Sequence, residues 1–322
     1  MLIRHVLYLQ RADVLGGQQA TVLEQLREAI PDVQLTFADC VDAVPEGLKV
    51  DVVITPTLPW LSDALSRLGR YRWLHFLSSG IERIWDMPFD KQGVLMTKSS
   101  GVHAAPISEY VIGAMLHFAK RFNRYVRNSD QCRWERYWLD ELTGARLTIL
   151  GLGHVGKAIA RRARAFDMHV IGTKRCPGHV PCVSGVVAQD AIWPYLGETD
   201  YLVVSLPLTD ETRGFVGKQL LSCLKPGAVL IDVSRGGVVC SDAVSEAIDQ
   251  GRLKGAALDV FERYPLPESS PLWKREEVLV TPHVSGTTPF YLDRALGIFK
   301  DNVRALQEGR PPLTAIDVNA GY

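Results

Sequence analysis

The sequence predicts an α/β protein built from two doubly wound parallel-sheet domains. Three observations predict this fold. Short apolar runs alternate with stretches of helical periodicity, a glycine-rich turn joins one of these runs to a helix, and 322 residues are enough for two domains. Strand–helix–strand order gives a parallel sheet that is covered by helices.

Apolar runs at residues 3–9, 50–54 and 73–77 predict buried strands of the first domain. Between the first two runs, residues 18–30 place their apolar side chains on one helical face, and Pro31 ends the predicted helix. The first domain therefore begins with a strand–helix–strand unit.

A long helix is predicted over residues 107–127. Its apolar side chains recur at spacings of three and four, at Ile107, Val111, Met115 and Phe118. Residues 132–140 follow with three aromatic side chains, Trp134, Tyr137 and Trp138, which indicate either an interface or a plain core role. We predict a homodimer contact here, because this much apolar surface is costly to leave in water.

The second domain is predicted from six further strands that alternate with helices. These strands are residues 146–150, 169–172, 201–205, 228–233, 255–259 and 278–281. A last helix, residues 288–309, is left over, and the first domain lacks a closing element. The sequence therefore predicts a discontinuous first domain of residues 1–100 and 287–322, with residues 101–286 inserted.

The composition excludes several classes of function. The 36 basic and 36 acidic side chains cancel, which removes the electrostatic argument for a nucleic-acid partner or an anionic membrane. Six scattered cysteines show no metal-ligand spacing and favour a reducing compartment. No apolar run is long enough to span a membrane, and the first residues do not resemble a signal peptide. We expect a cytoplasmic protein without a metal site.

The sharpest local motif is Gly151-Leu-Gly153-His-Val-Gly156, which follows one strand and opens a helix. In such a turn the first glycine allows the tight bend, the second lets the backbone approach a pyrophosphate, and the third permits close helix–strand packing. The helix N-terminus then favours the anionic phosphates. The sequence predicts a dinucleotide site here, and a purely structural turn is the alternative.

The end of the next strand indicates which dinucleotide binds. NAD-binding domains place an acidic residue there for the ribose 2′-hydroxyl, but this chain has Thr173-Lys174-Arg175. A hydroxyl group and two cations suit a 2′-phosphate, so the sequence predicts NADPH in preference to NADH. The alternative is a solvated basic turn.

Three more clusters follow strand ends and are expected to meet at one edge of the sheet. They contain Arg235, Asp259 and His283. An arginine and a histidine in such a crevice provide an anion clamp and a proton carrier. Either residue alone is more often a surface or core residue than a catalytic one, but the dinucleotide turn favours the functional interpretation.

Five segments resemble the D-isomer-specific 2-hydroxyacid dehydrogenase family. In chain order they are GLGHVGKAIA, SLPLTDETRGFVGKQLL, LKPGAVLIDVSRGGVV, GAALDVFERYPLP and TPHVSG. The basic turn, the PLPESSPLW stretch and the Asp-x-x-x-Gly-Tyr ending resemble the glyoxylate/hydroxypyruvate reductase A branch. The resemblance implies a Rossmann cofactor domain inserted into a discontinuous flavodoxin-like substrate domain, a homodimer, and NADPH-dependent reduction of a small 2-oxo acid to the D-2-hydroxy acid.

The resemblance also implies roles for matching residues. Arg235 matches the substrate arginine, His283 the proton-transferring histidine, and Asp259 the acidic residue at the nicotinamide end. The backbone of Ser79, Gly80 and Ile81 matches the loop that meets the substrate carboxylate. Further positions implied at the cofactor are His154, Val155, Leu206, Pro207, Thr212, Val233, Ser234, His283, Ser285 and Gly286.

One position departs from the family pattern DVFxxEP. Tyr264 stands where the family has the glutamate beside the histidine. A phenol cannot supply the negative charge of a carboxylate, although its oxygen could still orient the imidazole. Glu262 or Glu268 could substitute for the missing group. The departure leaves two functions open: a 2-oxo acid reductase, or an NAD(P)-binding sensor or corepressor-like protein with weakened chemistry.

Overall fold

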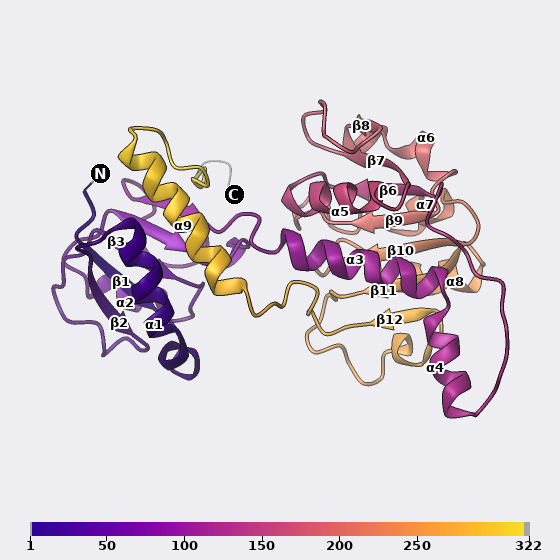
Figure 1. The fold of residues 1–322 in the computed structure, drawn as a ribbon, viewed down its shortest axis with the longest axis horizontal. Coiled ribbons are helices and arrows are strands. Elements are labelled where there is room, and N and C mark those ends of the chain that lie inside the picture. Colours follow the sequence, from indigo (N-terminus) through magenta and orange to yellow (C-terminus); the bar gives the residue numbers. More distant parts are fainter. Residues whose placement is uncertain (1, 319–322) are drawn as a thin grey trace. The chain divides into compact units, whose positions relative to one another are not determined.

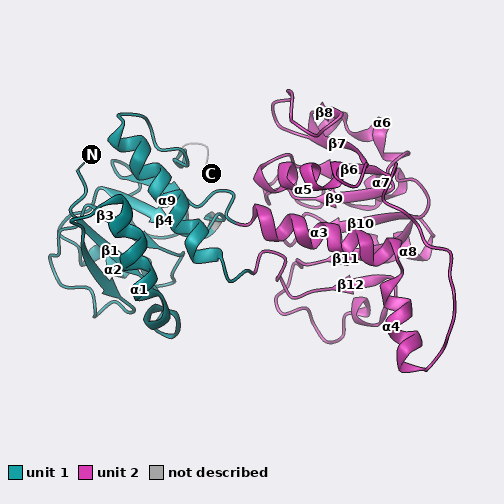
Figure 2. Ribbon diagram, viewed as in Figure 1, with its two compact units in different colours: residues 1–102, 288–322 teal, residues 103–287 magenta. Residues whose placement is uncertain are grey.

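The computed structural model describes residues 2–318, which form two compact units (Figures 1 and 2). One unit runs to Val102 and resumes at Thr288, and the other is His103–Thr287. Each unit holds one parallel sheet, so the predicted fold class is confirmed. The roles assigned to the two parts, substrate domain and cofactor domain, stay predictions. The Gly-Tyr ending used for the resemblance lies outside the described residues.

The first unit contains a five-stranded parallel sheet in the order β2-β1-β3-β4-β5. This is the flavodoxin-like order of doubly wound sheets. Its strands are β1 (His5–Leu9), β2 (Gln34–Ala38), β3 (Val52–Thr55), β4 (Trp73–Phe76) and β5 (Leu95–Lys98). The two strands that the sequence analysis missed, β2 and β5, are the edge strands, where polar residues dilute the apolar pattern.

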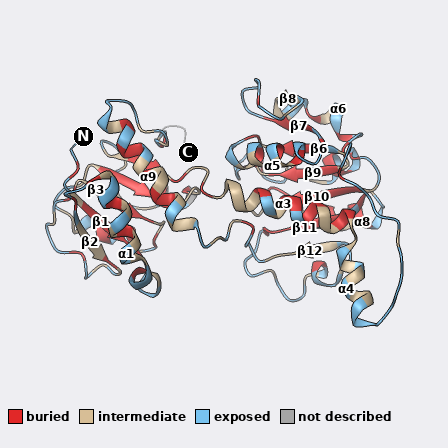
Figure 3. Cartoon of the chain, in the orientation of Figure 1, coloured by how far each residue is buried: buried red, intermediate tan, exposed pale blue. Residues whose placement is uncertain are grey.

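Helices α1 (Ala12–Ala29), α2 (Leu61–Ser66) and α9 (Tyr291–Gln307), with the 3-10 turn η1 (Glu82–Ile84), complete this unit. Helix α1 begins six residues before the predicted helix. Phe299 of α9 packs on Trp73 of β4, with ring centroids 4.9 Å apart. The C-terminal helix thus supplies the closing element that the N-terminal segment lacks. In Figure 3 the buried residues gather on the strands and on the inner faces of the helices.

The second unit contains a seven-stranded parallel sheet in the order β12-β11-β10-β9-β6-β7-β8. Its strands are β6 (Arg146–Leu150), β7 (His169–Thr173), β8 (Gly185–Val187), β9 (Tyr201–Val204), β10 (Ala228–Asp232), β11 (Leu253–Leu258) and β12 (Val278–Val280). Six of these strands were predicted, and β8, a short edge strand, was not. The order reverses between β6 and β9, and ligands bind at such switch points in doubly wound sheets.

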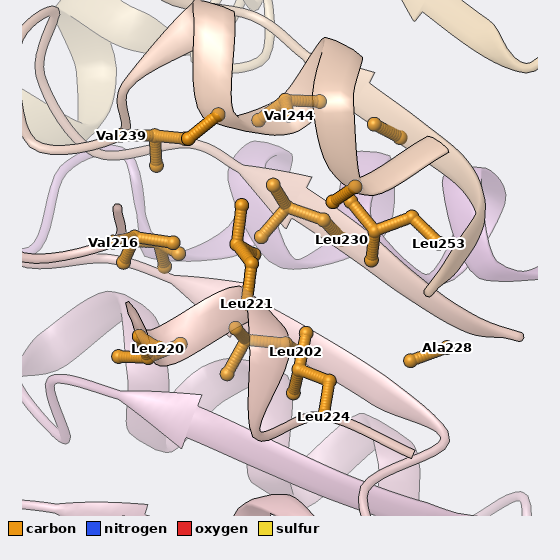
Figure 4. Close-up of a cluster of buried hydrophobic side chains, with 14 of the residues drawn as sticks. Leu202, Val216, Leu220, Leu221, Leu224, Ala228, Leu230, Val239, Val244 and Leu253 are labelled. Atoms are coloured by element: carbon orange, nitrogen blue, oxygen red, sulfur yellow. The ribbon is translucent and has the colours of Figure 1, made fainter. Parts of the chain in front are cut away.

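Helices cover both faces of this sheet. The helices of this unit are α3 (Ala104–Ala119), α4 (Phe122–Asp130), α5 (His154–Arg164), α6 (Trp193–Leu196), α7 (Lys218–Ser222) and α8 (Ser241–Asp249), with 3-10 turns η2 (Gln189–Ala191) and η3 (Pro271–Lys274). On one face, side chains of α7 and α8 pack on β9, β10 and β11 (Figure 4). On the other, α3 and α5 cover the sheet. The strand ends are therefore held in place from both sides.

The prediction of one long helix over residues 107–127 is wrong, because this segment contains parts of two helices. α3 ends at Ala119, and Arg121 adopts a left-handed backbone conformation with φ 52° before α4 begins. A left-handed residue breaks the hydrogen-bond ladder of a right-handed helix. The apolar periodicity also stops with α3, since α4 contains no buried residue.

The apolar face of α3 does not form the predicted intersubunit contact. Val111 and Met115 are fully buried, and Phe118 is 9% exposed, within the core of the second unit. Gly255 of β11 makes this packing possible, since a Cβ there would lie 2.4 Å from the Phe118 ring. The helix face is therefore consumed by its own sheet.

None of the helices in the described part of the chain combines the length and the apolar character needed to cross a bilayer.

A buried histidine in the first unit makes stability depend on pH. His75 of β4 is fully buried, and its ring nitrogens lie 2.6 Å from Thr97 Oγ1 and 3.2 Å from Ser99 Oγ. Burial lowers the pKa of His75 to about 3. The unfolded chain takes up a proton on this ring near pH 6.5, whereas the folded chain does not.

We therefore predict that, as the pH falls from 7 to 5, His75 lowers the free energy of unfolding by about 2 kcal/mol. Burial raises the pKa of Asp232 to about 7, which acts in the opposite direction over this range. Chemical denaturation of the wild type and of His75→Gln at both pH values isolates the histidine. The exposed His179→Gln serves as the control, and equal pH dependence in wild type and His75→Gln would contradict the prediction.

Candidate active site

The glycine turn has the geometry that the sequence predicts. Gly151 follows β6 with φ 99°, and a Cβ there would lie 2.9 Å from the Ser205 carbonyl oxygen. A Cβ on Gly156 would lie 2.1 Å from the Gly151 oxygen, so this glycine permits close packing. Within residues 2–318, no atom apart from those of Gly153 and its chain neighbours lies within 4 Å of the Cβ position of Gly153. The open position, next to the uncapped N-terminus of α5, leaves room for a phosphate to approach the backbone.

Thr173 holds this turn in place through two hydrogen bonds. Its side chain is buried, its hydroxyl oxygen accepts a hydrogen bond from Gly151 N–H at 3.0 Å, and its carbonyl accepts one from Leu152 N–H at 2.7 Å. The predicted use of the Thr173 hydroxyl at the 2′-phosphate is therefore corrected to a structural role. Lys174 and Arg175 are exposed at the end of β7. The missed strand β8 positions them, since Lys174 N–H donates to Val187 O at 3.0 Å.

The segment after β9 lies against the glycine turn. Leu206 is buried, and its Cδ2 atom lies 3.2 Å from the Cβ position of Gly151. Thr212 is also buried, and its hydroxyl donates to Pro207 O at 2.7 Å and accepts from Thr209 N–H at 2.8 Å. The Thr212 side chain therefore closes the loop that begins at Pro207, leaving Pro207 exposed beside the turn.

Arg235 lies in a tight loop after β10. Its Nη1 donates to Ser234 O at 3.0 Å, and its side chain is half-buried. Val233 and Ser234 before it are buried. A Cβ on Gly236 would lie 1.8 Å from Phe261 O, so only glycine permits this contact between the loop and the segment after β11. The loop is thereby fixed at the carboxyl end of the sheet.

Asp259 holds the loop that carries His283. Its carboxylate is fully buried and accepts hydrogen bonds from Thr281 Oγ1 at 2.6 Å, Val284 N–H at 2.8 Å and Ser285 N–H at 2.9 Å. His283 lies between these anchors, exposed, in a left-handed conformation with φ 56°. Such strain persists where the surroundings fix the backbone. Asp259 is thus a positioning residue, and its buried carboxylate offers almost no surface to the cofactor contact that the resemblance implies.

Helix α3 anchors the same loop, which the sequence analysis missed. Tyr110 Oη lies 2.8 Å from Thr281 Oγ1, and His103 Nδ1 lies 3.1 Å from Gly286 O. Burial raises the pKa of Tyr110 to about 12, so the phenol stays neutral beside the Asp259 network. Tyr110 lies on α3 and His103 is the residue directly before it; neither belongs to a local motif, and only the tertiary packing identifies them.

Tyr264 faces His283 with its ring rather than its hydroxyl. The two ring centroids are 5.6 Å apart with planes inclined by 33°, while the Tyr264 hydroxyl oxygen accepts a hydrogen bond from Phe261 N–H at 3.1 Å. The expectation that the phenol oxygen orients the imidazole is therefore wrong. Neither Glu262 nor Glu268, both exposed, pairs with His283 within residues 2–318.

Ser79, Gly80 and Ile81 follow β4 and belong to the first unit. Ser99 N–H donates to Phe76 O at 2.9 Å and Tyr291 Oη to Leu77 O at 2.7 Å, which fixes the strand end before them. Within the described chain, the N–H groups of these three residues donate to no backbone carbonyl. Adjacent N–H groups without such acceptors suit an anionic group.

Comparison with known proteins identifies the family. A family model described as "D-isomer specific 2-hydroxyacid dehydrogenase, NAD binding domain" matches residues 112–285. The glyoxylate/hydroxypyruvate reductase A of Serratia proteamaculans is 30% identical over 267 residues, which are 81% of this chain and 84% of that protein.

Solved structures agree over the whole length. The NADPH-dependent glyoxylate/hydroxypyruvate reductase of Sinorhizobium meliloti, in complex with NADP and sulfate, is 25% identical with a TM-score of 0.82, covering 99% of this chain and 100% of that one. A D-isomer specific 2-hydroxyacid dehydrogenase of Xanthobacter autotrophicus, in complex with NADPH and MES, is 27% identical with a TM-score of 0.86, covering both chains fully. The glycine turn, the Arg235 and His283 loops and these matches together show that the chain belongs to the D-isomer specific 2-hydroxyacid dehydrogenase family of NAD(P)-dependent oxidoreductases.

Proposed function

We propose that the chain reduces a small 2-oxo acid of the glyoxylate or hydroxypyruvate kind to the D-2-hydroxy acid with NADPH. One observation carries the proposal: the loops of Arg235 and His283 are both anchored at the carboxyl edge of the sheet that holds the glycine turn. An arginine and a histidine fixed on one edge provide a carboxylate clamp and a proton donor. The named relatives support this substrate class.

The cofactor fits the residues of the second unit. The open Cβ position at Gly153 and the uncapped start of α5 suit a pyrophosphate, and the exposed Lys174 and Arg175 suit a 2′-phosphate. The remaining positions proposed at the cofactor are Gly151, His154, Val155, Gly156, Leu206, Pro207, Thr212, Val233, Ser234, His283, Ser285 and Gly286. When bound, NADPH supplies the hydride for the carbonyl carbon of the substrate.

The chain's own residues do the rest. Arg235 binds the substrate carboxylate and polarises the carbonyl, because its guanidinium offers paired donors to an anion. Ser79, Gly80 and Ile81 of the first unit are further proposed as substrate-binding residues, through their backbone N–H groups. His283, as imidazolium, donates its proton to the oxygen on which negative charge develops. Asp259 keeps His283 in place without touching the substrate.

A second function is favoured by one observation, the Tyr264 ring in place of a carboxylate at His283. In this alternative the chain is an NAD(P)-binding sensor or a corepressor-like protein with weakened chemistry. The presence of both Arg235 and His283 supports the reductase instead. An assay of NADPH oxidation separates the two functions, since a sensor binds NADPH without oxidising it.

We predict that NADPH absorbance falls when glyoxylate or hydroxypyruvate is added, and that kcat/KM is higher with NADPH than with NADH. A charge-assisted contact is worth about 1.5–3 kcal/mol, so the preference is expected to be roughly tenfold to a hundredfold. Steady-state rates with both cofactors measure it. NADPH binding without turnover of any 2-oxo acid would support the sensor.

The same assay on Lys174→Asp locates the preference. The new carboxylate repels a 2′-phosphate and accepts a hydrogen bond from a 2′-hydroxyl, so the preference should shift toward NADH. Lys274→Asp places the same charge change on an exposed lysine of the same unit, in the 3-10 turn η3, and should leave the cofactor ratio as it is. Equal kcat/KM for the two cofactors in the wild type would exclude a role for the basic turn.

We predict that Tyr264→Glu extends reduction to higher pH. An adjacent carboxylate typically raises the pKa of an imidazole by about 1–3 units, because it stabilises the protonated ring. The phenol of Tyr264 carries no charge at neutral pH, since burial raises its pKa. The dependence of kcat/KM on pH should therefore extend by about one unit or more in the variant. Tyr264→Phe keeps the ring and is the control. An unchanged profile in an active Tyr264→Glu enzyme would assign the task to another residue.

We propose that the chain forms a homodimer through residues 132–140. Trp134 is 97% exposed and Trp138 is 95% exposed. Tyr137 between them is half-buried and stacks edge-on against Tyr125 of α4 at 5.6 Å, while Lys254 binds Asp140 at 2.5 Å. The segment is thus fixed at both points with its indoles outward, and such apolar surface is typical of an interface.

Light scattering at micromolar concentration should give about twice the 35.7 kDa chain mass for the wild type. The double variant Trp134→Ser, Trp138→Ser should give the single mass, because the indoles supply the buried apolar area. Trp273→Ser, at an indole that is 50% exposed in η3, is the matched control and should stay dimeric. A wild type of 35.7 kDa would remove the dimer. The cytoplasmic location stays a prediction.

A further inference from the structure

A second buried carboxylate lies behind the other catalytic loop. Asp232, the last residue of β10, is 2% exposed. Its Oδ1 accepts hydrogen bonds from Ser234 N–H at 3.0 Å and from Ser234 Oγ at 2.5 Å. Asp232 takes no part in the proposed binding of cofactor or substrate. A buried carboxyl group is costly unless its hydrogen bonds fix something.

The hydrogen bonds of Asp232 lead directly to Arg235. Ser234, which donates both of them, accepts a hydrogen bond on its carbonyl oxygen from Arg235 Nη1 at 3.0 Å. The other side of the loop is closed by Gly236, which packs against Phe261 O. The backbone of the guanidinium-bearing residue is therefore held from Asp232 on one side and from Phe261 on the other.

The two catalytic loops share one support. Asp259 N–H donates to Asp232 O at 3.1 Å, so the two carboxylates lie on neighbouring strand ends. Phe261, which contacts the Arg235 loop, donates its N–H to Tyr264, whose ring packs on His283. Asp232 therefore accepts hydrogen bonds from the Arg235 loop in the same way as Asp259 accepts them from the His283 loop.

We propose that Asp232 is a positioning residue that holds the Ser234–Arg235 turn in the conformation in which Arg235 binds the carboxylate of the substrate. This inference rests on the proposed function for the identity of the ligand. Burial and the negative charge of Asp259 raise the pKa of Asp232 to about 7. The positioning task needs an acceptor oxygen rather than a charge, because both groups that Asp232 binds are neutral donors.

The test uses three side chains of similar size at position 232 in the full-length protein. Asp232→Asn keeps an acceptor oxygen for Ser234, and Asp232→Leu removes it. Two readouts apply to each protein: hydrogen exchange of the backbone N–H groups of residues 234–237, and the dissociation constant of oxalate from the NADP-loaded protein. Oxalate is a carboxylate of the size of a small 2-oxo acid. Asp249→Asn, at an exposed ion pair with Arg275, is the control.

We expect Asp232→Leu to speed exchange and to weaken oxalate binding by about tenfold or more, the effect of losing hydrogen bonds to a carboxyl group. Asp232→Asn should stay within about threefold of the wild type in both readouts. NADP binding should change by less than oxalate binding, which separates a displaced Arg235 from general loosening. Ser234→Ala, which removes only the hydroxyl donor, should fall between and decides the matter if Asp232→Leu does not fold.

Wild-type exchange and oxalate affinity in Asp232→Leu would overturn the inference, as would an Asp232→Asn protein as impaired as Asp232→Leu. An equal loss of NADP and oxalate affinity would also overturn it. A wild type that reduces no 2-oxo acid overturns the proposed function instead. The exchange measurement then still decides whether Asp232 holds the turn.

Discussion

The carboxylate of Asp259 is the contact on which the active site depends. It lies at the end of β11, fully buried, and binds three donors of the segment that follows β12. One of them, Thr281, also contacts Tyr110 of α3. A strand, a loop and a helix therefore meet at one group, and His283 can keep its left-handed backbone only because this group fixes both of its flanks.

The sequence predicts the parts of this site that have a local signal. The three glycines of the turn differ in their surroundings as their spacing implies, since a Cβ would clash at Gly151 and Gly156 while the position at Gly153 is open. Thr173 carries no such signal. The sequence does not tell whether a threonine at the end of a strand exposes its hydroxyl or uses it to accept a hydrogen bond from the turn. The burial of Thr173 and its bond from Gly151 N–H decide this.

Tertiary packing explains the larger errors. The periodicity of Ile107, Val111, Met115 and Phe118 correctly indicates an apolar face, but periodicity does not say whether that face meets its own sheet or a second chain. The structure shows that this face meets its own sheet, because the Phe118 ring lies against Gly255 of β11. The helix break at Arg121 has a similar origin. The sequence after Arg121 is still compatible with a helix, but its residues no longer pack on the core that stabilises α3.

The two buried carboxylates fix the catalytic loops through neutral hydrogen-bond donors. Asp232 and Asp259 accept their hydrogen bonds from N–H and hydroxyl groups. A guanidinium bound to a buried carboxylate would be neutralised and held away from an incoming anion. Neutral donors fix the loops without this cost, so the two carboxylates hold the loops without a buried ion pair of their own.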